Sequence, residues 1–426
     1  MKDFFLRNLL QIYNGGSKIL IRKLKKLFRL FFTFIFYLPS IILFTLPIIL
    51  LIKLIKPIII IRFQEILSSR IGHFAGNLDL YIEEKKNYIN ISRSKKHYFD
   101  IFFLDGKQIS NLYLLTLWKK KIFFFPRFIC FPIYKFLILI KELSHIVGNN
   151  TQSDRDVNNL LENAKPNILL NSQENKIGFK YLEKLGIKKD QKIICLNVRD
   201  NAYLPELAYH NYRDGKIDDY IYAAEYLTKK GYFVFRMGKK VSETLNIDNP
   251  KIIDYASSPD RSDFLDIFLA SRCEFCISTS SGFDALCTIF RKPIAFVTVP
   301  IGYIYTFNKK YISITKHHVD MKTNRKLSID EVSDRNCFFA LNTKQYKINS
   351  IKLIDNNKEE ILNLCKEMIN LINDNFNRKP SIEEKIFWEK YKNLVKDYKQ
   401  NGLSIHGNYQ SYFSNQFLKN NKYILS

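Results

Sequence analysis

The feature that most limits how this chain can fold is an alternation of apolar segments and helical patterns that starts near residue 193. One amphipathic pattern starts at Asp218 and stops at Gly231. Strands and helices that alternate with short turns predict an α/β fold with a doubly wound parallel sheet. Short apolar runs typical of buried strands occupy residues 193–198, 232–236, 252–253, 275–277 and 294–299.

Such a sheet gathers its functional loops at one edge, because right-handed crossovers place them at the carboxyl ends of the strands. Arginine binds phosphate oxygens in a bidentate manner, and a Ser/Gly turn at a helix start offers backbone N–H donors and the helix dipole. The pattern therefore predicts a diphosphate site. Its candidate residues are Arg199, Arg213, Arg236, Gly238, Ser278, Ser280, Ser281, Gly282 and Asp284.

Three of these assignments have a plainer alternative. The turn at residues 278–282 also suits an ordinary N-capped helix, since Ser-rich caps are common. Arg236 also suits an ion pair with Asp254 or Asp266. Asp284 would then only complement the helix dipole from the first turn.

A reaction that matches this pattern is glycosyl transfer, in which a nucleoside diphosphate departs and fixed cations stabilise its growing charge. An inverting transfer also needs a base for the acceptor hydroxyl. We consider His73, between Gly72 and Gly76, the first candidate and His210 the second. Each of them also suits a hydrogen-bonded loop histidine.

The sequence contains no DxD where a metal-dependent sugar transferase would need one, and no P-loop, GxSxG or GxGxxG motif. We expect a metal-independent reaction with no cofactor. The seven cysteines are scattered, and Cys273 and Cys276 lack a second pair at zinc-ligand spacing. We expect buried free thiols and a reducing compartment.

The formal net charge of +25 does not indicate a nucleic-acid partner, because no recognisable nucleic-acid-binding motif accompanies it. Anionic lipid headgroups and a nucleotide diphosphate are the partners that this positive charge suits better. Residues 1–29 are basic and amphipathic, and residues 30–52 contain no charged residue. This pattern predicts a membrane-associated segment over residues 1–56, either re-entrant or spanning, with the re-entrant form favoured. A buried core helix is the alternative.

A series of short motifs follows one another along the chain. They are residues 70–73 (RIGH), 196–201 (LNVRDN), 210–213 (HNYR), 235–238 (FRMG), 253–256 (IDYA), 261–264 (RSDF), Asp266, 278–282 (STSSG) and Phe417-Leu418 with Asn420-Asn421. In this order they resemble a bacterial family assigned to surface-polysaccharide glycosyltransferases. The resemblance covers roughly residues 58–422 and implies a GT-B-like fold, with two Rossmann-like halves and the donor bound to the second.

The sequence thus predicts four parts. They are the membrane-associated segment 1–56, a Rossmann-like acceptor domain over 57–175, a Rossmann-like nucleotide-sugar domain over 176–375, and a C-terminal helix and tail over 376–426.

The predicted function is a membrane-associated glycosyltransferase at the cytoplasmic face of the inner membrane. Its partners would be a nucleotide-sugar donor, a lipid-linked or surface-glycan acceptor and an anionic membrane surface. A catalytically silent scaffold of a polysaccharide assembly complex and an O-fucosyltransferase-like enzyme that acts on protein are the alternatives.

Overall fold

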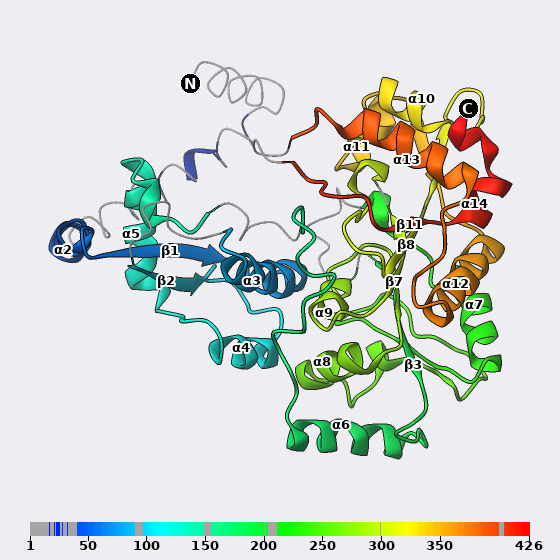
Figure 1. Ribbon diagram of the computed structural model, residues 1–426, viewed down its shortest axis with the longest axis horizontal. Helices are drawn as coiled ribbons and strands as arrows, with labels where there is room; N and C mark the ends of the chain where they lie inside the picture. Colours follow the sequence, from blue (N-terminus) through cyan, green and yellow to red (C-terminus); the bar gives the residue numbers. More distant parts are fainter. Residues whose placement is uncertain are drawn as a thin grey trace. The chain divides into compact units, whose positions relative to one another are not determined.

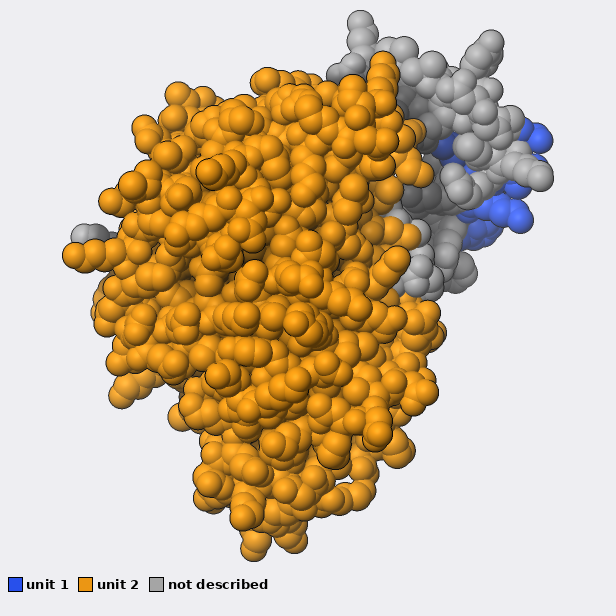
Figure 2. Space-filling view, turned by 90° about the vertical axis from the view of Figure 1, so that its right-hand side faces the viewer, with its two compact units in different colours: residues 1–65, 92–104, 123–147 blue, residues 66–91, 105–122, 148–426 orange. Residues whose placement is uncertain are grey.

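A computed structural model describes residues 41–89, 97–148, 155–200, 202, 211–298, 300–399 and 404–426, together with 17, 21, 23–25, 28 and 32. The chain forms two compact units, coloured separately in Figure 2. Unit 1 comprises residues 1–65, 92–104 and 123–147, and unit 2 comprises residues 66–91, 105–122 and 148–426. This division does not follow the predicted domain boundaries.

Unit 2 is built on a seven-stranded sheet with the order β11-β8-β7-β6-β3-β4-β5, in which every neighbouring pair is parallel. The α/β fold and the doubly wound parallel sheet predicted from the sequence are confirmed. The strands are β3 (Ile193–Asn197), β4 (Phe233–Arg236), β5 (Ile252–Ile253), β6 (Cys276–Ser278), β7 (Ile294–Thr298), β8 (Tyr311–Thr315) and β11 (Tyr412–Phe413).

Helices cover both faces of this sheet (Figure 1). On one face α7 (Asp218–Lys229) packs against α12 (Lys358–Asn373), and on the other α8 (Asp263–Arg272) packs against α9 (Asp284–Ile289). Ser262 caps α8 by accepting a hydrogen bond from the Leu265 N–H. Asp218 lies in the first turn of α7 and does not cap it, because Ile217 occupies the N-cap position.

Strand alternation divides the apolar side chains between the two faces. Ile194 and Leu196 join the core that includes α7 and α12. The thiol of Cys273, at the end of α8, lies 4.0 Å from that of Cys287 in α9. All seven cysteines are free and buried, which confirms the prediction.

The C-terminal region completes the core of unit 2. The tail predicted after the C-terminal helix contains a strand and further helical turns. β11 extends the sheet beside β8, and Phe413 is fully buried against Phe387 of α13 (Ile382–Val395). Further elements of this region are β9 (His317–Asp320), α10 (Ile329–Asp334), α11 (Thr343–Ile348), β10 (Ile351–Ile354), α14 (Asn415–Asn420) and the 3-10 helix η7 (Lys422–Leu425).

Unit 1 holds a two-stranded sheet of β1 (Ile59–Ile66) and β2 (His97–Leu104). A buried ion pair joins them, with 2.6 Å between Arg62 Nε and Asp100 Oδ1. The apolar core contains Ile52 of α2 and Ile133 of α5. The helices are π-helix η1 (Ile41–Thr45), α2 (Leu46–Ile55), α5 (Arg127–Leu139) and 3-10 helix η2 (Leu143–His145).

The membrane-associated segment predicted over residues 1–56 lies largely outside the described residues. Within the part that the structure describes, no helix combines the length and apolar character needed to cross a membrane. α2, at the end of that segment, has ten residues.

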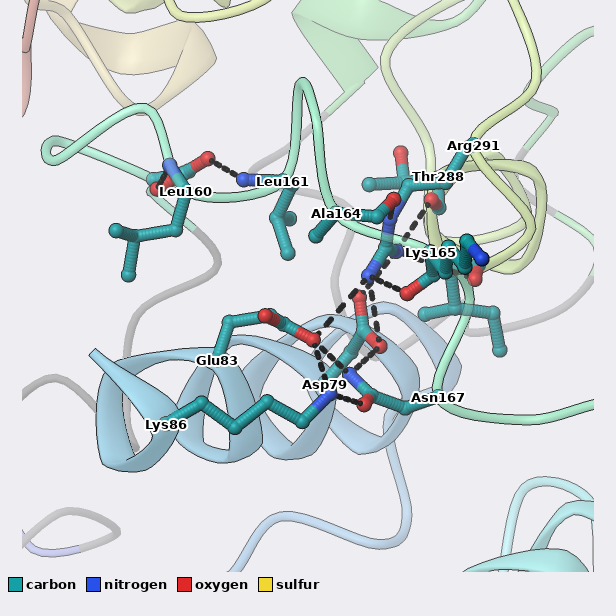
Figure 3. A network of polar contacts seen from close by, with 12 residues as sticks. Asp79, Glu83, Lys86, Leu160, Leu161, Ala164, Lys165, Asn167, Thr288 and Arg291 are labelled. Atoms are coloured by element: carbon teal, nitrogen blue, oxygen red, sulfur yellow. Dashed lines mark hydrogen bonds and ion pairs between the residues drawn. The ribbon is translucent and has the colours of Figure 1, made fainter.

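Three helices from the first half of the sequence belong to unit 2: α3 (Ile71–Lys86), α4 (Leu112–Lys119) and α6 (Ser172–Lys184). A buried polar network attaches α3 to the end of α9 (Figure 3). Arg291 Nη1 lies 2.6 Å from Asp79 Oδ2, and Arg291 Nε donates a 3.1 Å hydrogen bond to the Ala164 carbonyl. Asn167 Nδ2 donates to Asp79 Oδ1 at 2.9 Å.

This network buries the charges of Asp79 and Arg291 away from water, so each charge is stabilised by the other. The Asp79 side chain is fully buried, and burial raises its pKa although Arg291 opposes the shift. Segment 155–167 contributes buried residues here. Asp156 has no exposed surface.

Arg291→Ala should lower the free energy of unfolding by about 3–5 kcal/mol, because the Asp79 carboxyl would be left fully buried without its main partner. Lys184→Ala is the matched control. Its exposed pair with Asp260 should contribute at most about 1 kcal/mol. Urea denaturation followed by circular dichroism measures both. Equal losses in the two variants would contradict a stabilising role for the network.

Candidate functional site

The site lies where the strand order of the sheet reverses. β3 pairs with β6, yet the chain leaves β3 towards β4 and β5 and leaves β6 towards β7 and β8. The loops after β3 and β6 therefore diverge, and ligands of doubly wound sheets bind in the opening between such loops. A cavity occupies this position. Its lining includes residues 70–73, 110–111, 197–200, 237–241 and 280–284.

The turn after β6 is held to the end of β3 by side-chain hydrogen bonds. The amide of Asn197 donates to the Ser281 hydroxyl. The Arg199 N–H donates to Thr279 Oγ1 at 2.8 Å, and Arg213 Nη1 donates to the Ser280 carbonyl at 3.2 Å. Ser280 has a φ of +54°, the left-handed conformation of a tight turn. These contacts hold the predicted Ser/Gly turn against both arginines.

Arg199 and Arg213 bring two positive charges to the same wall of the cavity. Burial and the neighbouring Arg213 charge lower the pKa of Arg199. Its Nε lies 2.9 Å from Asp214 Oδ1, so within the described residues this carboxylate compensates one of the two cations. An anion bound here would relieve the repulsion between the guanidinium groups. This electrostatic arrangement suits a phosphate or diphosphate.

A third wall comes from the loop after β4. Gly238 lies here, with Lys239 and Lys240 beside it. Lys239 Nζ donates a 2.7 Å hydrogen bond to the Ser110 carbonyl. Asp200 holds the loop by accepting from the Ser242 N–H at 2.9 Å. The lysines add to the positive charge of the two arginines.

The N-terminal end of α3 supplies the fourth wall and carries His73. A methyl group on Gly282 would lie 3.0 Å from the Gly72 nitrogen and 2.8 Å from Ile71 Cγ2. The two glycines therefore let α3 approach the Ser/Gly turn at backbone distance. This approach brings His73 to the cavity.

Most predicted site residues meet at this one cavity. Ser278 is fully buried just below it, and its hydroxyl donates to Asp284 Oδ2 at 2.9 Å. His210 lies outside the described residues. α9 has only six residues, so the helix dipole expected from the sequence is short, and the arginines supply more of the charge. The predicted residues that line the cavity are His73, Arg199, Arg213, Gly238, Ser280, Ser281, Gly282 and Asp284.

Arg236, like Ser278, does not line the cavity, and its assignment to the donor needs correction. It is the last residue of β4 and pairs in register with Leu196, so both point to the face that α7 and α12 cover. Arg236 is 4% exposed and does not line the cavity. Its Nη1 donates to the Glu243 carbonyl at 2.6 Å and lies 3.4 Å from Asp254 Oδ2. The alternative, an ion pair with Asp254, describes this geometry.

Sequence reasoning missed several lining residues. Asn197 ends β3, and Lys239 and Lys240 follow β4. Arg199 was predicted because the carboxyl ends of parallel strands gather the functional loops, and the same rule applies to these three residues. Ser110 and Asn111 precede α4, and no local pattern distinguishes them. Asp266 also lines the cavity. Burial raises its pKa to about 6 while its ion pair with Arg261 opposes the shift.

The arrangement offers cations and hydrogen-bond donors in place of metal ligands. Within the described ranges, no group of three or more His, Cys, Asp or Glu side chains is placed to hold a metal ion. The cavity can bind a polyanion and present a histidine beside it.

No family model and no curated protein match the sequence. Among solved structures, ADP-heptose lps heptosyltransferase II of E. coli is similar at 10% identity and a TM-score of 0.42. The match covers 74% of this chain and 100% of that chain. A glycosyl transferase family 9 protein from Veillonella parvula matches at 10% identity and a TM-score of 0.39, over 72% and 97% of the two chains.

Arg236→Met should destabilise unit 2 by about 3 kcal/mol, because Asp254 loses its partner within a nearly buried ion pair. The affinity of the folded variant for a nucleoside diphosphate should stay within about twofold of the unaltered protein, since the side chain points away from the cavity. Thermal denaturation and calorimetric titration measure the two quantities. A folded variant with unchanged stability and much weaker binding would restore the donor-binding assignment.

Proposed function

We propose that this protein is a glycosyltransferase that takes its sugar from a nucleoside-diphosphate donor. The observation that carries the proposal is the cavity at the β3/β6 strand-order reversal. There Arg199 and Arg213 converge on the turn at residues 278–282. The resemblance of the ordered motifs to surface-polysaccharide glycosyltransferases supports the same class.

The donor diphosphate would bind between the two arginines and the turn. Arg199 and Arg213 would bind its oxygens, and the small residues Ser280, Ser281 and Gly282 would let those oxygens approach the backbone. Asn197 and Thr279 would hold the turn in place through the hydrogen bonds already described.

Transfer would break the bond between the anomeric carbon and the diphosphate oxygen, with the electron pair leaving on the diphosphate. The acceptor hydroxyl oxygen would form the new bond to that carbon. Arg199 and Arg213 would stabilise the leaving charge in the role that a metal ion has in other transferases. In an inverting transfer His73 would remove the acceptor proton, since α3 presents it to the same cavity.

The acceptor would be a lipid-linked or surface glycan, and the enzyme would act at the cytoplasmic face of the inner membrane. The basic N-terminal sequence and the uncharged run at residues 30–52 support this location, because they favour contact with an anionic bilayer.

Arg213→Met should raise the dissociation constant of the donor about tenfold to a hundredfold, because a charge-assisted hydrogen bond to phosphate is lost. Arg325→Met is the control, since that side chain is 58% exposed and pairs with Glu331 away from the cavity. A panel of nucleotide sugars, tested by thermal shift and titration, identifies the donor and measures both variants. Equal affinity of Arg213→Met and the unaltered protein for every donor bound would refute this role.

His73→Gln should lower kcat about a hundredfold or more and leave donor affinity nearly unchanged, as expected for loss of a general base. His97→Gln, an exposed change in unit 1, is the control. The assay measures the transfer of sugar from the donor to acceptors in a lipid extract, in the absence of divalent metal. Donor binding without transfer in any extract would favour the catalytically silent scaffold. An unchanged kcat in His73→Gln would remove this histidine from the mechanism.

A further inference from the structure

Unit 1 exposes large apolar side chains on two neighbouring helices. Leu54 of α2 and Leu139 of α5 are each 76% exposed, and Ile58 and Phe128 are nearly as open at 74% and 75%. Phe128 and Leu139 are about three helical turns apart and so lie on one side of α5. Scattered exposed apolar residues are ordinary, but a concentration of them marks an interaction surface.

α2 is apolar on both of its faces. Ile49 and Ile52 are buried in the core of unit 1, while Leu50 and Leu54 point outwards, 67% and 76% exposed. A surface helix normally turns a polar side to water. A helix that is apolar all round is normally covered by protein or by lipid, so the outer face of α2 calls for an apolar neighbour.

Lysines border this exposed surface and join the two helices. Lys53 of α2 and Lys56, the residue after α2, lie 3.5 Å and 3.2 Å from the carboxylate of Glu142, just after α5. Leu139 and Leu143, 76% and 64% exposed, are close to Glu142 in sequence. Lys135 and Lys141 are also exposed here, so four lysines accompany one glutamate. The border is positively charged.

We propose that this surface of unit 1 binds an anionic lipid bilayer at the level of the headgroups. The outer side chains of α2 and α5 would enter the boundary between headgroups and acyl chains, and the lysines would contact lipid phosphates. Apolar residues bordered by lysine match that boundary in both polarity and charge. The surface also continues directly from the uncharged sequence at residues 30–52.

This inference does not depend on sugar transfer, because vesicle binding involves no donor. It also goes beyond an anchor in the N-terminal sequence, because α5 comes from a different part of the chain. In this proposal α2 and α5 would lie in the interface between headgroups and acyl chains.

The test uses the full chain and vesicles of phosphatidylcholine with phosphatidylglycerol. The double variant Leu54→Glu with Leu139→Glu should weaken flotation with these vesicles about tenfold or more. The double variant Leu169→Glu with Ile382→Glu is the matched control. Its side chains are 74% and 75% exposed, but they belong to unit 2. The control should bind as the unaltered protein does.

A fluorophore attached to Leu54→Cys or Leu139→Cys should shift to the blue on these vesicles, and one on Ile382→Cys should not. The seven native thiols are buried, which favours labelling at the new site. Pure phosphatidylcholine or high salt should weaken binding. Equal flotation of both double variants, or no shift at residues 54 and 139, would overturn the proposal. Flotation of neither the unaltered chain nor its variants would overturn it as well and point to a protein partner.

Discussion

The candidate site depends on one constraint, the pairing of β3 with β6 in a parallel sheet whose chain runs outwards from both. This arrangement leaves an opening above the two strand ends that the sheet itself cannot fill. Asn197 and Ser278 pair in register and so point to the same face. The Ser/Gly turn, Arg199 and Arg213 are then held together by hydrogen bonds between the two loops. The strand order of the sheet thus brings the positive charges of Arg199 and Arg213 to one cavity.

The site also requires α3, because the N-terminal end of this helix lines the same cavity. Gly72 and Gly282 permit backbone contact at the N-terminal end of the helix, and the ion pair of Asp79 with Arg291 attaches its middle. Both contacts bridge about two hundred residues of sequence. His73 is presented to the cavity because these two contacts position α3, so the histidine depends on a buried ion pair outside the cavity.

Sequence reasoning succeeded where local chemistry decides the outcome. The strand at residues 193–198 needs only a hydrophobic pattern, and it was found. Arg199 was found because it follows a strand. Arg236 was misassigned because it ends a strand, where period-two alternation turns it to the face of Leu196. The contact of α3 with α9 could not be predicted, since it depends on packing between distant segments. β11 was missed because two residues are too few to form a recognisable pattern.

Hydrogen–deuterium exchange tests most directly whether the β3/β6 reversal is a diphosphate site. The full chain would be measured with and without a saturating nucleoside diphosphate, taken from a panel of bases. Bound ligand orders the backbone it touches, so exchange should slow at residues 197–200, 237–241 and 278–284. Exchange at β9 and β10, which form a separate sheet, should not change. No slowing at these loops with any nucleotide, or slowing confined to residues outside the cavity, would contradict the account.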